Sequence, residues 1–203
     1  MFIQIRGTFG SGKSTTAHGL QDALAAQGWI DGPVVFYEHH FAQCFSREDL
    51  SAFIYFMGRG RAGADANSWK GAMEQIEQFI RDRAPAHAVV MEGSIVSSMK
   101  FVRMAADLQG QGVKCQFFDM NTDLEECIRR VEGRRLRRFE SGLTKLPPKP
   151  VKRKGVEGLY KAVERIHTKT VEAGLPCSWI STSPESTELI LEHIMEAVHG
   201  TAA

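Results

Sequence analysis

The stretch GTFGSGKST, residues 7–15, decides the fold, and it directly follows the short apolar run FIQIR at residues 2–6. Its first eight residues match the pattern G-x-x-x-x-G-K-S/T, whose glycines let backbone N–H groups turn inward around phosphate oxygens. The residues from Lys13 to about Gly28 read as a helix, which would direct the positive end of its dipole at the same anion. We therefore predict a phosphate-binding loop between a strand and a helix. Its residues are Gly7, Gly10, Ser11, Gly12, Lys13, Ser14 and Thr15.

Two side chains of this loop have expected roles. Lys13 would span the β- and γ-phosphates of a nucleoside triphosphate, and Ser14 would supply a hydroxyl to Mg²⁺. The alternative is a glycine-rich turn with a solvated lysine. Chance produces the pattern in on the order of one in a hundred chains of this size, and the strand-loop-helix setting lowers that frequency further. The phosphate-binding interpretation is therefore favoured.

Length and composition limit the class of protein. The 203 residues are 43% hydrophobic, which suits one α/β domain over residues 1–203 with room for a small lid. No apolar run approaches the roughly 20 residues of a membrane span, and MFIQIRG lacks the apolar core of a signal peptide. The four cysteines are scattered without a CxxC pair, as is typical of reduced thiols in the cytoplasm. We expect a cytoplasmic protein that has no membrane partner.

Strand-like and helix-like patterns alternate along the whole chain. This alternation predicts a parallel sheet that is covered by helices on both faces and binds its ligands at the carboxyl ends of the strands. Thr122 and Glu125 are spaced as a capping box for a helix through the following arginines, and Ser183 would open the last helix. The predicted strands are 2–6, 34–38, 88–92, 113–119 and 177–180, and the other predicted helices are 46–57, 67–83, 98–109 and 156–173.

Positive charge is concentrated in one segment, although the net charge of the chain is only +1. Residues 129–154 contain eleven basic residues and two acidic ones, so this segment carries +9 and the remainder carries −8. Arg130, Arg134 and Arg138 are spaced by four and would share one helical face. The proline-containing break at 146–150 leads into further lysines, which could follow a phosphate backbone with roughly one phosphate neutralised per cation. The segment therefore predicts an anionic partner, most simply a nucleic acid.

Together with two later motifs, the phosphate loop resembles that of the P-loop nucleoside, nucleotide and polynucleotide kinase superfamily. VVMEGS, residues 89–94, looks like the third-strand motif of these kinases, which places an acid at the strand end. FFDMNTDLEECIRRVEGRR, residues 117–135, looks like their fourth strand, a short turn and an arginine-bearing lid helix. The resemblance implies a three-layer α/β/α fold with a five-stranded parallel sheet, a basic helical lid at about 127–155, and ATP with Mg²⁺ as ligands. In size and layout the chain is also similar to phage-type 5-hydroxymethyluracil DNA kinases, which would act in the host cytoplasm.

The resemblance assigns roles to carboxylates at two strand ends. Glu38 ends the second predicted strand, where related kinases that act on hydroxyls place a general base. Glu92 ends the third predicted strand and would bind Mg²⁺ together with Ser14 or orient the acceptor. The alternatives are a surface carboxylate at the first position and a carboxylate satisfied by backbone N–H groups at the second.

The resemblance also assigns the residues that would cover ATP. Arg130 and Arg134 of the lid would close over the triphosphate and stabilise charge on the transferred phosphoryl group. The alternative is a solvated basic helix face, but only Glu132 and Glu140 lie within the segment to pair with its arginines. Ser183 falls in the loop that contacts the nucleotide base in these kinases, which makes it a candidate adenine contact.

These observations favour an ATP-dependent kinase that phosphorylates a hydroxyl on a nucleic acid. Two acceptors fit, namely a polynucleotide 5′-hydroxyl and the hydroxymethyl group of a modified pyrimidine in DNA. A kinase of free nucleosides or nucleoside monophosphates is an alternative, because GRGRAG at 58–63 could serve a monophosphate acceptor. A DNA-stimulated P-loop ATPase or binding module and a kinase of small metabolites also remain open.

Overall fold

The computed structural model describes residues 1–29, 35–36, 77–93, 99–182 and 187–200. Some features expected from the sequence lie outside these residues and stay predictions. They are Glu38, Cys44, the helix at 46–57, the GRGRAG segment at 58–63, residues 67–76 of the helix predicted at 67–83, and Ser183.

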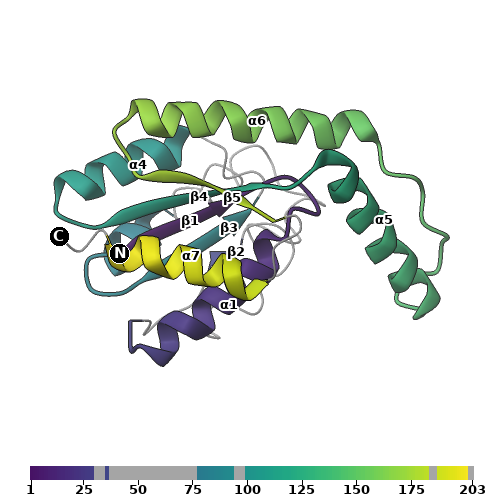
Figure 1. Cartoon of the computed structure of the whole chain (residues 1–203), viewed down its shortest axis with the longest axis horizontal. Coiled ribbons are helices and arrows are strands. Elements are labelled where there is room, and N and C mark those ends of the chain that lie inside the picture. The colour runs from purple at the N-terminus through teal and green to yellow at the C-terminus, as the bar shows by residue number, and fades with distance from the viewer. Residues whose placement is uncertain (30–34, 37–76, 94–98, 183–186, 201–203) are drawn as a thin grey trace.

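A parallel sheet forms the centre of the molecule (Figure 1). Its strands run in the order β2-β3-β1-β4-β5, and every neighbouring pair is parallel. Four strands have five to seven residues, whereas β2 has two. The parallel sheet expected from the alternating pattern is therefore confirmed. The strands are β1 (Phe2–Arg6), β2 (Val35–Phe36), β3 (Val89–Gly93), β4 (Cys115–Asn121) and β5 (Cys177–Ser181).

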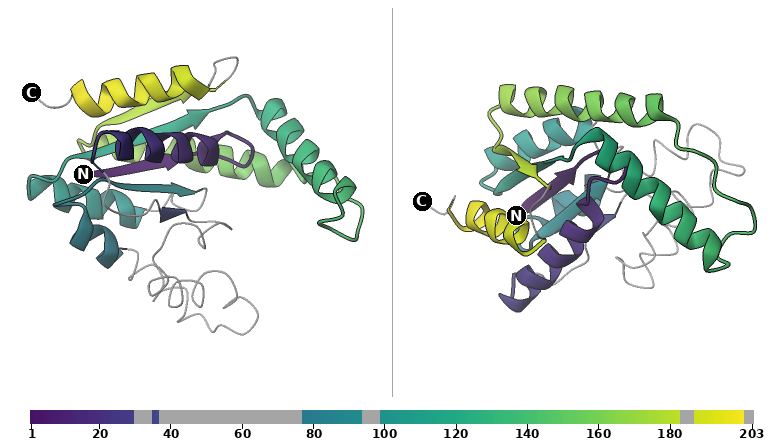
Figure 2. Two further views of the ribbon diagram at one scale, coloured as in Figure 1. Left: turned by 90° about the horizontal axis from the view of Figure 1, so that it is seen from below. Right: turned by 45° about the vertical axis from the view of Figure 1, so that its right-hand side comes forward.

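Helices cover both faces of this sheet, so the fold has three layers (Figure 2). One apolar cluster joins the sheet to α1 and α7, and a second joins the opposite face to α4, α6 and the helical residues 77–83. Because both faces are buried, the strands are apolar along most of their length, and all five residues of β1 are buried. The helices are α1 (Lys13–Ala26), α4 (Met99–Gly110), α5 (Leu124–Glu140), α6 (Arg153–Glu172) and α7 (Thr187–Gly200).

The order in which the chain adds strands to the sheet reverses direction beside β1, and such a reversal leaves a crevice at the strand ends. The chain leaves β1 toward β2 on one side of the sheet, whereas β4 leads to β5 on the other side. Ligands of parallel sheets bind outside the carboxyl ends of the strands at such a reversal. The phosphate loop follows the carboxyl end of β1, and therefore lies at the expected position.

Residues 129–154, called the basic arm below, extend away from the sheet. Figure 1 shows α5 running outward beyond the strand ends and the linker returning from its far end to the start of α6. Nearly all residues from 132 to 155 are exposed. Among the described residues, no helix has both the length and the apolar character that a membrane span requires.

Candidate active site

The phosphate loop presents the N-terminus of α1 without a side-chain cap. Gly12 is the N-cap residue, and no side chain in the described part of the chain caps this helix end. The first N–H groups of an α-helix have no partner within the helix, so those at the start of α1 are available to an anion. Gly12 has a φ of 93°, a left-handed backbone conformation that residues other than glycine rarely adopt. The loop therefore requires glycine at this position because of its backbone conformation.

The loop is packed directly against the first turns of α5. A Cβ atom at Gly10 would lie 2.3 Å from the carbonyl oxygen of Cys127, and the φ of Gly10 is also left-handed, at 80°. Thr122, which precedes α5, donates its hydroxyl to the carbonyl oxygen of Ser11 at 3.0 Å. The phosphate loop and the base of the basic arm are therefore one packed unit.

Ser14 and Glu92 meet at the carboxyl edge of the sheet, although 78 residues separate them. The Ser14 hydroxyl donates to Oε1 of Glu92 at 3.1 Å, and Glu92 is almost fully buried at the end of β3. A hydroxyl and a carboxylate are the oxygen donors that Mg²⁺ prefers, and they lie beside the anion-binding helix end. The residues present therefore fit the predicted metal position.

Lys13 points back along the phosphate loop. Its side chain is only 6% exposed, and Nζ donates to the carbonyl oxygen of Thr8 at 3.1 Å. The hydroxyl of Thr8 donates to the carbonyl oxygen of Val156 on α6 at 3.3 Å. The ammonium group is thus held within the loop itself, and its predicted role at a triphosphate stays a prediction.

Arg130 is the lid arginine that the fold brings to the phosphate loop. Its guanidinium donates to the carbonyl oxygen of Gly10 at 3.5 Å and to that of Thr182 at 3.4 Å. Arg134 lies one helical turn farther along α5 and is exposed, without a contact to the loop. The structure therefore brings one of the two predicted lid arginines to the site and leaves the other in solvent.

Glu126 positions Arg130, and the sequence reasoning missed it. Its carboxylate accepts from Nε of Arg130 and from the guanidinium of Arg129, each at 2.6 Å. Hydrogen bonds from these two arginines lower the pKa of Glu126 to about 2. The expectation that only acids within 129–154 could pair with the arginines is therefore wrong. The spacing of three and four residues from Glu126 was the available signal.

The start of α5 differs from the predicted capping box. Asp123, not Thr122, is the N-cap residue, and its carboxylate accepts from the backbone N–H groups of Glu125 and Glu126. Thr122 is instead buried and hydrogen-bonds to Ser11 and to the hydroxyl of Thr182. Aspartate is as good a cap as threonine, and its position one residue later frees the threonine to join three loops.

The linker of the basic arm is tied back to α5. Arg135 donates to the carbonyl oxygen of Lys149 at 3.0 Å, and Glu132 accepts from the backbone N–H of Val151 at 3.2 Å. Arg153 forms an ion pair with Glu157 at 2.8 Å and a second one with Glu125 at the start of α5. The end of the linker that leads into α6 is therefore anchored, although nearly all of the linker side chains are exposed.

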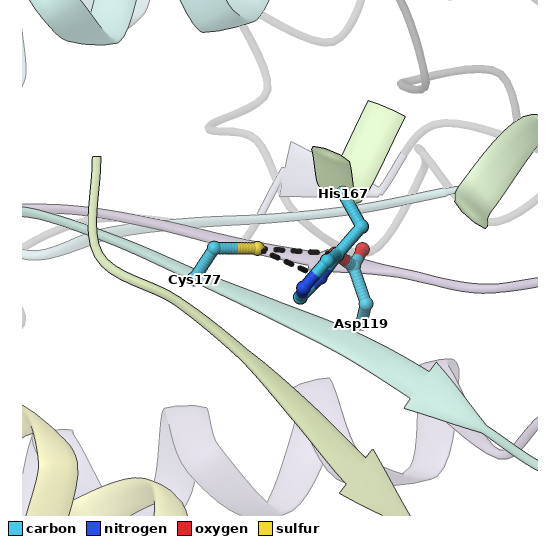
Figure 3. Close-up of side chains that lie close together, drawn as sticks. All are labelled: Asp119, His167 and Cys177. Carbon is cyan, nitrogen blue, oxygen red and sulfur yellow. Dashed lines mark hydrogen bonds and ion pairs between the residues drawn. The ribbon is translucent and has the colours of Figure 1, made fainter. Parts of the chain in front are cut away.

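A polar cluster lies on the opposite side of β1 from the phosphate loop helix. The carboxylate of Asp119, Nδ1 of His167 and Sγ of Cys177 lie within 4.8 Å of one another (Figure 3). Arg6, the last residue of β1, makes a two-point ion pair with Asp119 at 2.7 Å for each bond, and both side chains are fully buried. Arg6 also lies 3.2 Å from Cys177 Sγ.

The positive guanidinium makes this cluster a poor cation site. It already neutralises the carboxylate and would repel a metal ion held by the same atoms. Burial is the main cause that raises the pKa of Cys177, so its thiol remains protonated. We interpret the cluster as a buried ion-pair network that fixes β1 to β4 and α6 directly behind the phosphate loop. The sequence signal for this network was the presence of two charged residues, Arg6 and Asp119, in strands that are predicted to be buried.

The strand order and the phosphate loop together define a P-loop kinase fold. No protein-family model matches the chain. In sequence, the chain is similar to a 5-hmdU DNA kinase of Pseudomonas phage PaMx11, with 28% identity over 180 residues, which are 86% of this chain and 87% of that protein.

Solved structures share the architecture over the full length of the chain. Shikimate kinase from Acinetobacter baumannii, in complex with shikimate, has a TM-score of 0.56 and 11% identity, covering 99% of this chain and 94% of that one. Deoxyadenosine kinase from M. mycoides, with bound dATP, has a TM-score of 0.50 and 14% identity, covering 98% and 99%. At these identities the likeness concerns the fold.

Proposed function

We propose that this protein is an ATP-dependent kinase that transfers the γ-phosphoryl group to a hydroxyl on a nucleic acid. One observation carries the proposal. The basic arm begins beside the phosphate loop, because Cys127, two residues before the arm, packs against Gly10 and Arg130 donates to the Gly10 carbonyl. A polyanion held by the arm would therefore lie beside the phosphoryl donor. The 28% identity to a phage 5-hmdU DNA kinase supports the same class of acceptor.

The donor half of the reaction uses the loop and the start of α1. Backbone N–H groups from Gly10 to Thr15 would surround the β- and γ-phosphates, and the Lys13 ammonium would turn from the Thr8 carbonyl to span them. Arg130, which reaches the loop from α5, would stabilise the charge of the transferred phosphoryl group. Arg134 would contribute only if the arm moved toward the loop.

Transfer replaces one P–O bond by another. The acceptor oxygen bonds to the γ-phosphorus, the bond from that phosphorus to the bridging oxygen breaks, and ADP leaves. The acceptor proton must pass to a base, for which we propose Glu38. Glu38 follows Phe36 by two residues in the sequence, and Phe36 pairs with Glu92 across β2 and β3, which supports a position on the acceptor side.

Ser14 and Glu92 would hold Mg²⁺ when ATP binds. The ion would neutralise charge that develops on the phosphate oxygens. The two side chains already meet, because the Ser14 hydroxyl donates to Oε1 of Glu92 at 3.1 Å. Ser183, which follows Thr182 at the Arg130 contact, remains our candidate for the adenine-contacting residue.

The hydroxymethyl group of a modified pyrimidine in DNA is our leading acceptor, and a polynucleotide 5′-hydroxyl is the second. The test is transfer from γ-labelled ATP to hydroxymethylated oligonucleotides, plain oligonucleotides with a 5′-hydroxyl, nucleosides and nucleoside monophosphates. Label on oligonucleotides, lost in Lys13→Ala, is expected. Label on free nucleosides or nucleotides alone would refute the proposal and favour a nucleoside kinase. ATP hydrolysis without any labelled product would favour an ATPase. A phage-encoded enzyme of this kind would act in the host cytoplasm.

A further inference from the structure

The far end of the basic arm carries two leucines that stand almost entirely in solvent. Leu143 is 71% exposed and Leu146 is 77% exposed, more than any other large hydrophobic residue in the described part of the chain. A single exposed apolar residue needs no explanation, but these two occupy the tip of a segment that carries +9. Neither has a role in phosphoryl transfer.

The loop that presents the leucines is held in a defined shape. Gly142 adopts a left-handed φ of 73° after the end of α5, and the backbone N–H of Thr144 donates to the carbonyl oxygen of Arg138 at 3.2 Å. Farther along, the bonds from Arg135 to Lys149 and from Val151 to Glu132 tie the linker to the helix. The leucines therefore stand exposed on a loop whose two ends are both hydrogen-bonded to α5.

The cations around the tip are free to bind an anion. The cations nearest the tip are Arg137, Arg138, Lys145 and Lys149. Within the described residues, none of these four side chains forms an ion pair with a carboxylate, whereas Arg129, Arg130 and Arg153 each do. Exposed leucines enclosed by unpaired cations fit a partner that presents both negative charge and apolar surface.

Duplex DNA is such a partner, because opening a base step exposes apolar base faces between the flanking phosphates. A second copy of the chain is disfavoured, because two arms that each carry +9 repel one another. The helix α5 also connects the tip to the phosphate loop. From Arg130 to Glu140 it spans about 15 Å at 1.5 Å per residue, which corresponds to about four base pairs at 3.4 Å each. The arm therefore reaches along a duplex whose reacting base lies at the phosphate loop.

We propose that the arm tip is a duplex wedge. Leu143 and Leu146 insert at a base step, while the surrounding cations hold the phosphates on either side. This inference rests on the proposed function, because a hydroxymethyl group on a paired base must leave the duplex before it can reach ATP. Unstacking a step a few base pairs away bends and loosens the duplex, and apolar side chains are the usual means of doing so. The wedge thus makes the target base easier to extrude.

The test compares Leu143→Ala/Leu146→Ala with the wild type on one hydroxymethylated base, placed in a duplex and in a single strand. The variant should lose about tenfold or more in kcat/KM on the duplex, because it no longer offsets the cost of unstacking a base step. It should change little on the single strand, which needs no unstacking. A 2-aminopurine placed about four base pairs from the target should brighten with the wild type and not with the variant. Val171→Ala, which trims an exposed side chain on α6 outside the arm, should match the wild type.

Each other result overturns the wedge. Equal losses on duplex and single strand would make the leucines a general contact or a structural element. No loss on either would leave them without a role in binding DNA. Binding of the wild type to phosphatidylglycerol vesicles, abolished in the variant while duplex activity persists, would assign the tip to a lipid surface. A dimer that dissociates in the variant would assign it to a second copy.

The failure of this inference is distinguishable from that of the proposed function. If the wild type labels no oligonucleotide in either form, the nucleic-acid kinase proposal itself fails. If it labels both forms and the double variant behaves like the wild type, only the wedge fails. The single-strand measurement also guards against misfolding, because a misfolded variant would lose that activity as well.

Discussion

The buried ion pair between Arg6 and Asp119 predicts a large loss of stability in Asp119→Asn. The amide has nearly the same volume, but it removes the charge that neutralises Arg6 and turns an N–H donor toward other donors. The Asp119 carboxylate accepts two bonds from Arg6 at 2.7 Å and one from His167 at 2.8 Å. Both members of the ion pair are fully buried, so water cannot replace the lost partner.

The expected magnitude follows from that burial. Removing one partner of a buried ion pair costs about 3–5 kcal/mol, because the other charge is left uncompensated. A domain has about 5–15 kcal/mol of total stability, so the variant would lose a large share of it. At about 2–4 °C per kcal/mol for a chain of this length, the midpoint of thermal unfolding should fall by roughly 6–20 °C.

Urea unfolding followed by tryptophan fluorescence measures this loss, with calorimetry as a second probe. Glu172→Gln is the matched control, because Lys169 and Glu172 form an exposed pair, 56% and 55% accessible, and should lose under about 1 kcal/mol. The double variant Arg6→Met/Asp119→Leu should be more stable than Asp119→Asn, because it buries no unpaired charge. A loss below about 1 kcal/mol in Asp119→Asn, or a double variant no better than the single one, would refute the reasoning.

Three further predictions follow from the site. Gly10→Ala should weaken ATP binding by about tenfold or more in calorimetric titration, because its Cβ would lie 2.3 Å from the Cys127 carbonyl oxygen and a left-handed alanine costs about 1–2 kcal/mol; unchanged binding would contradict this geometry. Glu126→Gln should lower kcat by releasing Arg130. Because the pKa of Glu126 is lowered to about 2, the stability that it adds is fully present above its ordinary pKa of 4.5 and is lost as pH falls from there through 2. The difference in unfolding free energy between wild type and variant should shrink over that range, and a difference that persists at pH 2 would be inconsistent with it. In Cys44→Ser, the remaining thiols should react with maleimide far more slowly in the folded than in the urea-unfolded protein, because burial raises their pKa values, two of them to about 11; equal rates would show that they are accessible.

Much of the fold and the donor half of the site could be predicted from the sequence because both depend on local patterns. The phosphate loop needs glycines, a lysine and a hydroxyl at fixed spacing before a helix, and all of these lie within nine consecutive residues. Alternating strand and helix patterns likewise require a parallel sheet with both faces covered. The helix through the arginines was also predictable, although its cap proved to be Asp123, since neighbouring polar residues compete for one position.

The tertiary structure alone decided which distant groups meet. Ser14 and Glu92 are 78 residues apart, and Arg6 and Asp119 are 113 apart, so their contacts depend on the strand order. Spacing in the sequence placed Arg130 and Arg134 on one helical face, but only the packing of Cys127 against Gly10 determined that Arg130 reaches the loop and Arg134 does not. The sequence by itself determined that a loop with the phosphate-binding pattern joins a strand to a helix, because those constraints are local. The fold decided which side chains stand beside that loop, because long-range contacts are set by how the layers pack.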